Sequence, residues 1–284
     1  MTGIAIRSNA RSIRRLFGTL LERASGAARL GFESVGRGTK FVGDYGSWEA
    51  ALRDSGGYDA PKILHKALDA ILKVKTGEAA YERDTVVFDR IEYSFPLLAA
   101  LLLTASRDHG RLSVLDFGGA LGSVYFQNRK LLSHLKEVRW GVVEQEHFVA
   151  CGSERVADAQ LSFHRDIAEC AAAIKPNFAL LSGVLSYLES PYAVLEELQL
   201  RELPFICLDR SFVSLEGGTR LTVQMVPPTI YEASYPCWIL DEEELLDRAA
   251  RGYRLIYDFP ALDGGEVRLA GLRATFKGYL FARV

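Results

Sequence analysis

A glycine-rich turn between a short apolar strand and a helix is the feature that most constrains how this chain folds. Residues 114–122 read Val-Leu-Asp-Phe-Gly-Gly-Ala-Leu-Gly, and apolar residues at helical spacing follow them. Glycines let a backbone turn sharply and approach a ligand, because no Cβ is in the way. The free N–H groups at the start of the next helix face the same place. The segment therefore predicts a strand–turn–helix unit of an α/β sheet, with a ligand at the carboxyl end of its strand.

An acidic residue closes the next apolar strand. The sequence there is Trp140-Gly-Val-Val-Glu144. A carboxylate at this position can accept two hydrogen bonds from ribose hydroxyls. A tight turn without a ligand and a solvated strand end are the alternative interpretations of the two features. Their combination favours a nucleotide-like cofactor at this edge of the sheet.

The spacing of the glycines distinguishes between two cofactors. A dinucleotide fingerprint has glycine at its first, third and sixth positions, which are Gly118, Ala120 and Ser123 here. An acid-x-Gly-x-Gly-x-Gly spacing fits better, because Asp116, Gly118 and Gly122 match and only the middle glycine is replaced. This pattern resembles motif I of the class I S-adenosylmethionine-dependent methyltransferases. The resemblance implies S-adenosylmethionine as the cofactor and S-adenosylhomocysteine as the product.

Strands and helices alternate along the rest of the chain. We expect helices at residues 124–135, 191–200 and 241–250, and further strands at 161–167, 178–184, 205–210, 253–259 and 276–284. Such alternation predicts an α/β fold with a doubly wound, mostly parallel sheet. The resemblance implies seven strands, a closing C-terminal hairpin and a helical N-terminal extension. The expected regions are a basic amphipathic segment with a glycine-rich connector (1–40), a helical cap (41–105) and the methyltransferase domain (106–284).

The resemblance also assigns residues to the cofactor site. In methyltransferases an acid after the third strand typically faces the adenine amino group, and Asp166 has that place here. The neighbouring apolar residue, Ile167, would pack on the ring. The segment after the fourth strand lines the methyl donor in this class. The predicted cofactor-binding residues are Asp116, Phe117, Gly118, Gly119, Ala120, Gly122, Glu144, Gln145, Asp166, Ile167, Ser182 and Gly183.

Several short phrases are more specific than the class. They include Tyr81-Glu-Arg-Asp84, Ser123-Val-Tyr-Phe-Gln127 and Ile230-Tyr-Glu-Ala-Ser-Tyr-Pro236. Together they resemble a family of bacterial methyltransferases of unassigned substrate, from about residue 41 to the C-terminus. This resemblance strengthens the prediction of the cofactor and leaves the acceptor open.

The acceptor site is predicted from aromatic and polar residues on either side of the glycine turn. Residues 220–238 form an unusual insertion after the fifth strand, where class I enzymes often place acceptor-recognition elements. Aromatic rings there could stack on a sugar or a flat acceptor, or could form a rigid packed hairpin. Preceding helices often shape the acceptor pocket in this class. The predicted substrate-binding residues are Tyr81, Arg83, Tyr187, Gln224, Tyr231, Tyr235 and Trp238.

Methyl transfer from a sulfonium is an in-line displacement, so the protein mainly holds the two partners in position. A hydroxyl acceptor often needs a general base, for which His147 and Asp209 are the candidates and His134 a weaker one. A rim histidine without a proton role and an internal ion pair of Asp209 with Arg210 are the alternatives. Ser182-Gly-Val184 stands where enzymes that methylate nucleobase or glutamine nitrogen carry an Asp/Asn-Pro-Pro-aromatic motif. We therefore expect a small-molecule or glycan-like acceptor, methylated at oxygen.

Composition excludes several partners. The net charge of −2 gives no overall attraction to nucleic acid. The longest apolar run, residues 97–105, is too short to span a bilayer, and no secretory signal is evident. The four cysteines lack metal-site spacing and no acidic cluster suggests a metal, so we expect none. A reducing cytoplasm is the simplest setting.

Residues 4–28 combine an apolar stripe with five flanking arginines. Such a helix could lie on an anionic membrane at the inner face, dock on an acidic partner, or pack on its own domain. Two other functions remain open. One is an NAD(P)-dependent oxidoreductase, which the positions of Ala120 and Ser123 disfavour. The other is a non-catalytic scaffold, which the acids Asp116, Glu144 and Asp166 disfavour.

Overall fold

The computed structural model describes residues 39–56, 60–227, 233–262, 264–269 and 271–284. The chain divides into two units, Met1–Thr39 and Lys40–Val284, and every element below belongs to the second unit. The predicted amphipathic segment (4–28) and Tyr231 lie outside the described residues.

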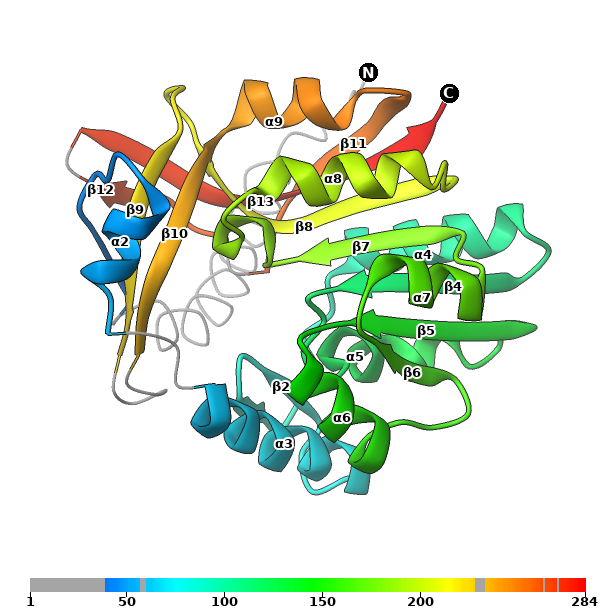
Figure 1. Ribbon diagram of the computed structural model, residues 1–284. Coiled ribbons are helices and arrows are strands. Elements are labelled where there is room, and N and C mark those ends of the chain that lie inside the picture. The colour runs from blue at the N-terminus through cyan, green and yellow to red at the C-terminus, as the bar shows by residue number, and fades with distance from the viewer. Residues whose placement is uncertain (1–38, 57–59, 228–232, 263, 270) are drawn as a thin grey trace, which may run out of the picture. The chain divides into compact units, whose positions relative to one another are not determined.

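A mostly parallel sheet forms the centre of the second unit (Figure 1). Five parallel strands lie in the order β6-β5-β4-β7-β8. β13 pairs antiparallel with β8, and β11 pairs antiparallel with β13 on its other side. The predicted doubly wound α/β sheet and its C-terminal hairpin are therefore confirmed. These seven strands are β4 (Arg111–Phe117), β5 (Glu137–Val143), β6 (Leu161–His164), β7 (Phe178–Ser182), β8 (Phe205–Ser214), β11 (Tyr253–Pro260) and β13 (Leu272–Arg283).

Helices cover both faces of this sheet, because its strands are apolar on both sides. Successive residues of β4 show the alternation. Val114 packs in one core with α4 and α5, and Leu115 packs in a second core with α7 and α8. The helices are α3 (Ala60–Thr76), α4 (Phe95–Arg107), α5 (Ser123–Leu132), α6 (Glu146–Arg155), α7 (Ile167–Ile174), α8 (Pro191–Leu200) and α9 (Glu242–Ala249). None of these described helices is both long and apolar enough to cross a membrane.

The sheet is larger than the seven strands that the sequence predicts. β8 continues beyond the end of β7, and its residues 213–214 pair with β10 (Ala233–Asp241). β10 pairs with β9 (Arg220–Val226), and β9 pairs with β1 (Lys40–Val42). We call β1, β9 and β10, with α2 (Trp48–Arg53) against them, the extension (Figure 1). With β12 (Val267–Leu269) on β13, the described residues form an eleven-stranded sheet.

The region before β4 is less helical than expected. Besides α2, α3 and α4 it contains β1 and a separate hairpin of β2 (Tyr81–Arg83) and β3 (Val86–Phe88). We call this pair the β2–β3 hairpin. The sequence pattern showed the helices because their apolar spacing is local, whereas the partner of β1 lies about 180 residues away on β9.

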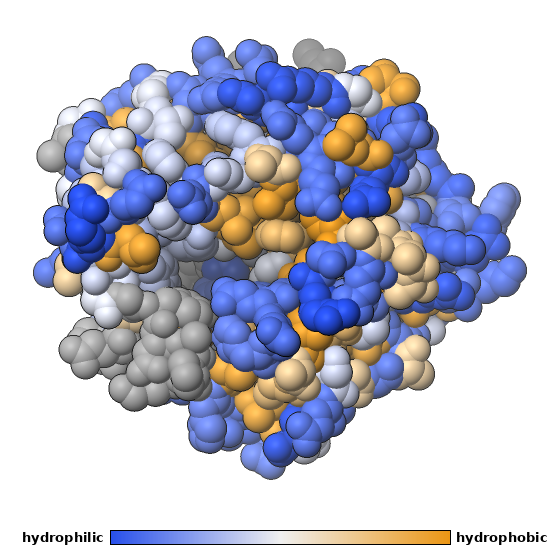
Figure 2. All heavy atoms as spheres, viewed as in Figure 1, coloured by the Kyte–Doolittle hydropathy of each residue, from blue (hydrophilic) through white to orange (hydrophobic). Residues whose placement is uncertain are grey.

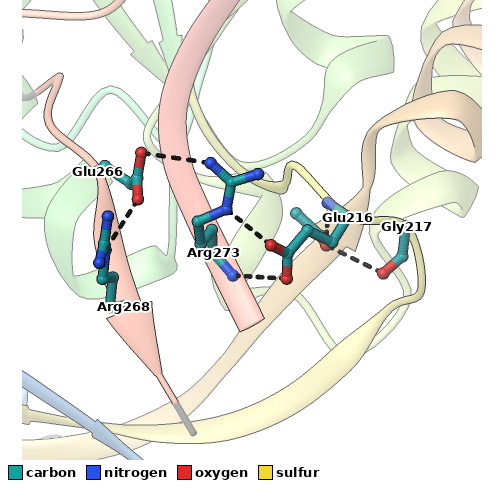
Figure 3. A network of polar contacts seen from close by, with 6 residues as sticks. Glu216, Gly217, Glu266, Arg268 and Arg273 are labelled. Atoms are coloured by element: carbon teal, nitrogen blue, oxygen red, sulfur yellow. Dashed lines mark hydrogen bonds and ion pairs between the residues drawn. The ribbon is translucent and has the colours of Figure 1, made fainter. Parts of the chain in front are cut away.

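Charged side chains connect the turn after β8 to β12 and β13 (Figure 3). Arg273 Nε lies 2.6 Å from Glu216 Oε1, and Arg273 Nη1 lies 3.8 Å from Glu266 Oε2. Arg268 Nε contacts the other oxygen of Glu266 at 3.0 Å. Partly exposed ion pairs of this kind each contribute about 0–1 kcal/mol, so packing rather than charge stabilises the end of the sheet.

Candidate active site

The glycine turn packs directly against the chain after β7. Gly118 has φ +72°, and its N–H donates to the Val143 carbonyl at 2.9 Å. A Cβ on Gly118 would lie 2.4 Å from Cγ2 of Val184. Gly122 has φ +89° and precedes the first residue of α5. Glycine is therefore required at both positions, because one has no room for a side chain and both have left-handed backbones.

Asp116 lies beneath this turn and is 1% exposed. Its Oδ2 accepts a hydrogen bond from Trp140 Nε1 at 2.9 Å, and a Cβ on Gly119 would lie 2.5 Å from the same oxygen. Among the described residues nothing hydrogen-bonds the buried Oδ1. Burial raises the pKa of Asp116 to about 7, against the opposing effect of the Trp140 bond. A buried carboxyl oxygen without a partner is what a polar ligand at the turn would satisfy.

Glu144 lies next to the turn, as the sequence predicts from its position after β5. Its N–H donates to the His164 carbonyl at 3.1 Å, which continues the pairing of β5 with β6. Its Oε2 accepts from the Gln145 N–H at 2.8 Å. Burial raises the pKa of Glu144, and backbone hydrogen bonds from Gln145 and Ala120 oppose that rise. The acid and the turn therefore form one continuous surface.

Asp166 and Ile167 occupy the start of α7. Asp166 is exposed, and its Oδ1 accepts from the Glu169 N–H at 2.7 Å as the N-cap of that helix. Ile167 is 3% exposed and packs in the core. β6 ends at His164, three residues earlier than expected. Contact of this pair with an adenine stays a prediction.

Ser182 and Gly183 meet Asp209 where β7 ends beside the middle of β8. Ser182 Oγ donates to Asp209 Oδ2 at 2.7 Å, and the Gly183 N–H donates to the Asp209 carbonyl at 2.9 Å. Asp209 is 4% exposed. The other predicted base, His147, lies in α6 after β5, where Nε2 is buried with no hydrogen-bond partner in the described chain. β4 and β7 separate β5 from β8, so the strands that lead to the two bases lie roughly 14 Å apart in the sheet.

The β2–β3 hairpin carries two contacts that the sequence analysis did not identify. Glu82 is 4% exposed, and its Oε1 accepts a hydrogen bond from Ser123 Oγ at the start of α5. Burial raises the pKa of Glu82 to about 7. Asp84 forms an ion pair with Arg210 on β8. The signal was present in the sequence: three charged residues in succession, residues 82–84, lie in an otherwise apolar neighbourhood.

Four of the residues predicted to bind the methyl acceptor lie close together, on the extension and beside it. Tyr187 OH donates to Gln224 Oε1 at 2.8 Å, and its ring meets Tyr235 edge-on at 5.4 Å between centroids. Trp238 Nε1 donates to the Leu188 carbonyl at 3.0 Å, so the hairpin of β9 and β10 packs against the segment after β7. Tyr81 and Arg83 lie elsewhere, buried in the β2–β3 hairpin.

Figure 2 shows apolar residues gathered between α7 and α8, where β7 reaches this face.

Metal-ligating side chains do not cluster in the described part of the chain, which contains no group of three or more His, Cys, Asp or Glu residues able to hold an ion.

No protein-family model matches the chain, and no curated protein matches its sequence. Solved structures resemble it at low identity. The N-terminal domain of EvdMO1, in the presence of SAH and D-fucose, is 14% identical with a TM-score of 0.46, covering 80% of this chain and 97% of that one. The 1,6-didemethyltoxoflavin-N1-methyltransferase of Burkholderia thailandensis is 12% identical with a TM-score of 0.39, covering 81% and 92%.

A third similar structure is CalS10, an amino pentose methyltransferase from Micromonospora echinaspora. It is 11% identical with a TM-score of 0.39, covering 68% of this chain and 92% of that one. Because these three TM-scores lie below 0.5, what this chain does has to be inferred from its own site.

Proposed function

We propose that this chain is a class I S-adenosylmethionine-dependent methyltransferase. The observation that carries the proposal is the position of the Asp116–Gly118–Glu144 group. β4 has β5 on one side and β7 on the other, because the chain runs outward from β4 through β5 to β6 and then crosses back to β7 on the opposite side of β4. Ligands of doubly wound sheets bind at this switch point. The sheet order β6-β5-β4-β7-β8-β13-β11, with an antiparallel β13, is the seven-stranded arrangement that the motif resemblance implies.

The residues at this point suit the cofactor. The lack of a side chain at Gly118 lets Val184 pack against the turn, which brings the segment after β7 beside the proposed cofactor site. Glu144 is placed to accept hydrogen bonds from ribose hydroxyls. The free oxygen of Asp116 offers a further acceptor beneath the turn. When bound, S-adenosylmethionine supplies an electrophilic methyl group.

We further propose a small-molecule or glycan-like acceptor that is methylated at oxygen. Tyr187, Gln224 and Tyr235 offer ring faces and polar groups beside the end of β7. We take Asp209 as the base, since it lies beside the end of β7 with Ser182, and it would take the proton of the attacking hydroxyl. His147 lies on the Glu144 side, next to the predicted ribose position.

The cofactor assignment is tested by calorimetry with S-adenosylhomocysteine, with NADH as a competitor. We expect micromolar binding that Glu144→Ala weakens at least tenfold, about 1.4 kcal/mol. Glu154→Ala is the matched control, because Glu154 is an exposed acid on α6, the helix that follows Glu144. Absence of binding to the wild type, or displacement by NADH, would instead favour the scaffold or the oxidoreductase.

We propose that the enzyme is bacterial, works in the cytoplasm and has no nucleic-acid partner. We keep the three regions 1–40, 41–105 and 106–284 as the proposed division of the chain. The basic segment at residues 4–28 could hold it peripherally at the membrane. Cosedimentation with anionic liposomes tests this, comparing the full chain with a variant that lacks the first thirty or so residues. Equal binding by the two would remove the membrane contact.

A further inference from the structure

A bulge in β8 turns Arg210 toward the active-site edge of the sheet. Leu208 pairs with Tyr279 and Ser211 with Lys277, so Asp209 and Arg210 together oppose the single residue between those partners on β13. β7 ends opposite Asp209, at Ser182. Arg210 is therefore the first residue of β8 beyond the end of β7. Bulges of this kind re-aim side chains next to active sites.

The pairing of Arg210 with Asp84 joins two unusual backbones. Arg210 Nη2 donates to Asp84 Oδ2 at 2.6 Å. Arg210 has φ +53° and Asp84 has φ +51°, and both values lie in the left-handed region that non-glycine residues rarely adopt. Strain of this kind persists only where the surroundings impose it, and it concentrates at functional sites. The pKa of Asp84 is lowered, because the charge and hydrogen bond of Arg210 outweigh the desolvation of the carboxyl within the pair.

This ion pair and the Glu82–Ser123 hydrogen bond together hold the β2–β3 hairpin at two points. Ser123 follows the turn after β4, whereas Arg210 lies on β8 and close to Gly183 at the end of β7. β7 lies between β4 and β8 in the sheet. The two contacts of the hairpin therefore reach elements on both sides of β7, and the predicted substrate residue Arg83 lies between the two attachment points Glu82 and Asp84, with Tyr81 just before them.

We propose that Arg210 is a positioning residue, whose ion pair with Asp84 holds the β2–β3 hairpin over the proposed S-adenosylmethionine site. This inference rests on the proposed function. The side chains of Arg210 and Asp84 are 22% and 48% exposed, and a pair as exposed as this contributes little to global stability. Its loss frees the hairpin locally and leaves the fold intact.

The test combines hydrogen exchange without ligand and S-adenosylhomocysteine calorimetry. Asp84→Asn removes the charge, and asparagine tolerates the left-handed backbone. In Asp84→Asn we expect the backbone amides of residues 81–88 to exchange about tenfold faster, and those of β4 to exchange at the wild-type rate. The melting temperature should not change, and the Kd for S-adenosylhomocysteine should rise about fivefold. The double variant Asp84→Arg with Arg210→Asp re-forms the pair with reversed charges and should recover most of both losses.

Asp44→Asn is the matched control, since it breaks the Arg220–Asp44 pair of the extension, whose side chains are 24% and 70% exposed. It should change neither readout. An unchanged rate of hydrogen exchange in the hairpin of Asp84→Asn, or an equal change in Asp44→Asn, would overturn the positioning role of Arg210 and leave the proposed function standing. Failure of the wild type to bind S-adenosylhomocysteine would overturn both.

Discussion

The glycine turn and the extension are built in different ways. At the turn, Asp116 lies under Gly119 in the same segment, and Glu144 at the end of the next strand reaches the backbone of Ala120, whereas Val184 packs on Gly118 from the more distant segment after β7. In the extension, segments far apart in the chain pair with one another, such as Phe41 with Gln224. The proposed S-adenosylmethionine site is therefore formed largely by local geometry. The proposed site for the methyl acceptor is formed by long-range packing. Variants that affect one region and spare the other measure how separate they are.

The largest effect is expected from Gly118→Ala at the turn. The new Cβ would meet Val184 at 2.4 Å, on a backbone with φ +72°. Left-handed strain costs about 1–2 kcal/mol and overpacking about 1–3 kcal/mol more, so unfolding should become about 3 kcal/mol easier. Binding of S-adenosylhomocysteine should be lost. Chemical denaturation and calorimetry measure the two effects.

Gly252→Ala is the control for that variant. Gly252 has φ +75°, and a Cβ there would find no atom within 4 Å. Only the backbone strain remains, so its cost should be about 1–2 kcal/mol with normal ligand affinity. Equal losses of stability in the two alanine variants would show that the contact with Val184 does not matter.

The two regions should also differ in their response to pH. Burial raises the pKa of Glu82 to about 7 from 4.5, whereas hydrogen bonds from backbone amides lower the pKa of Asp241, at the end of β10. A carboxyl whose pKa is raised on folding favours the fold below pH 4.5, and that contribution is lost as pH rises to about 7. Wild-type stability should therefore fall across that window and stay level above it.

Glu82→Gln removes the part of this pH dependence that Glu82 contributes, leaves the part that the buried Asp116 contributes, and keeps an acceptor for Ser123. At 1.36 kcal/mol per pKa unit, the rise from 4.5 to about 7 makes the variant more stable than the wild type at pH 8 by about 3 kcal/mol, and equal to it near pH 4. Denaturant titrations at a series of pH values measure this. Glu78→Gln, at an exposed acid just before the hairpin, should leave the profile unchanged. A parallel profile for Glu82→Gln would mean that Glu82 is not a buried carboxyl.

The contrast between the regions also explains what the sequence could predict. The turn, Asp116 and Glu144 were predictable because a glycine pattern, a strand end and an acid are all local signals. The bulge at Arg210 was not, because it depends on where β13 places Gly278 opposite β8. The hairpin of β9 and β10 corresponds to one of the two alternatives that the sequence left open for residues 220–238. β1 and β12 were missed, since a three-residue strand such as β1 is defined by its partner.

The smallest effect on the donor site is expected from Trp238→Ala in the extension. The variant removes the stacking of Trp238 on Trp48, at 6.1 Å between ring centroids, and the hydrogen bond to Leu188. Loss of a half-buried tryptophan should cost about 2 kcal/mol, less than the 3–5 kcal/mol of a fully buried aromatic residue.

The affinity for S-adenosylhomocysteine should change less than twofold in Trp238→Ala, because the donor residues follow β4 and β5 rather than β10. Trp238→Phe keeps a ring for Trp48 and loses only the indole N–H, so it should cost about 1 kcal/mol. A large loss of ligand affinity in Trp238→Ala alone would show that the two regions are coupled through η1 (Leu185–Tyr187), which lies between Gly183 and the contact at Leu188. The extension would then help to form the S-adenosylmethionine site. The glycine turn and the extension would differ in how they are built and would still act together in binding.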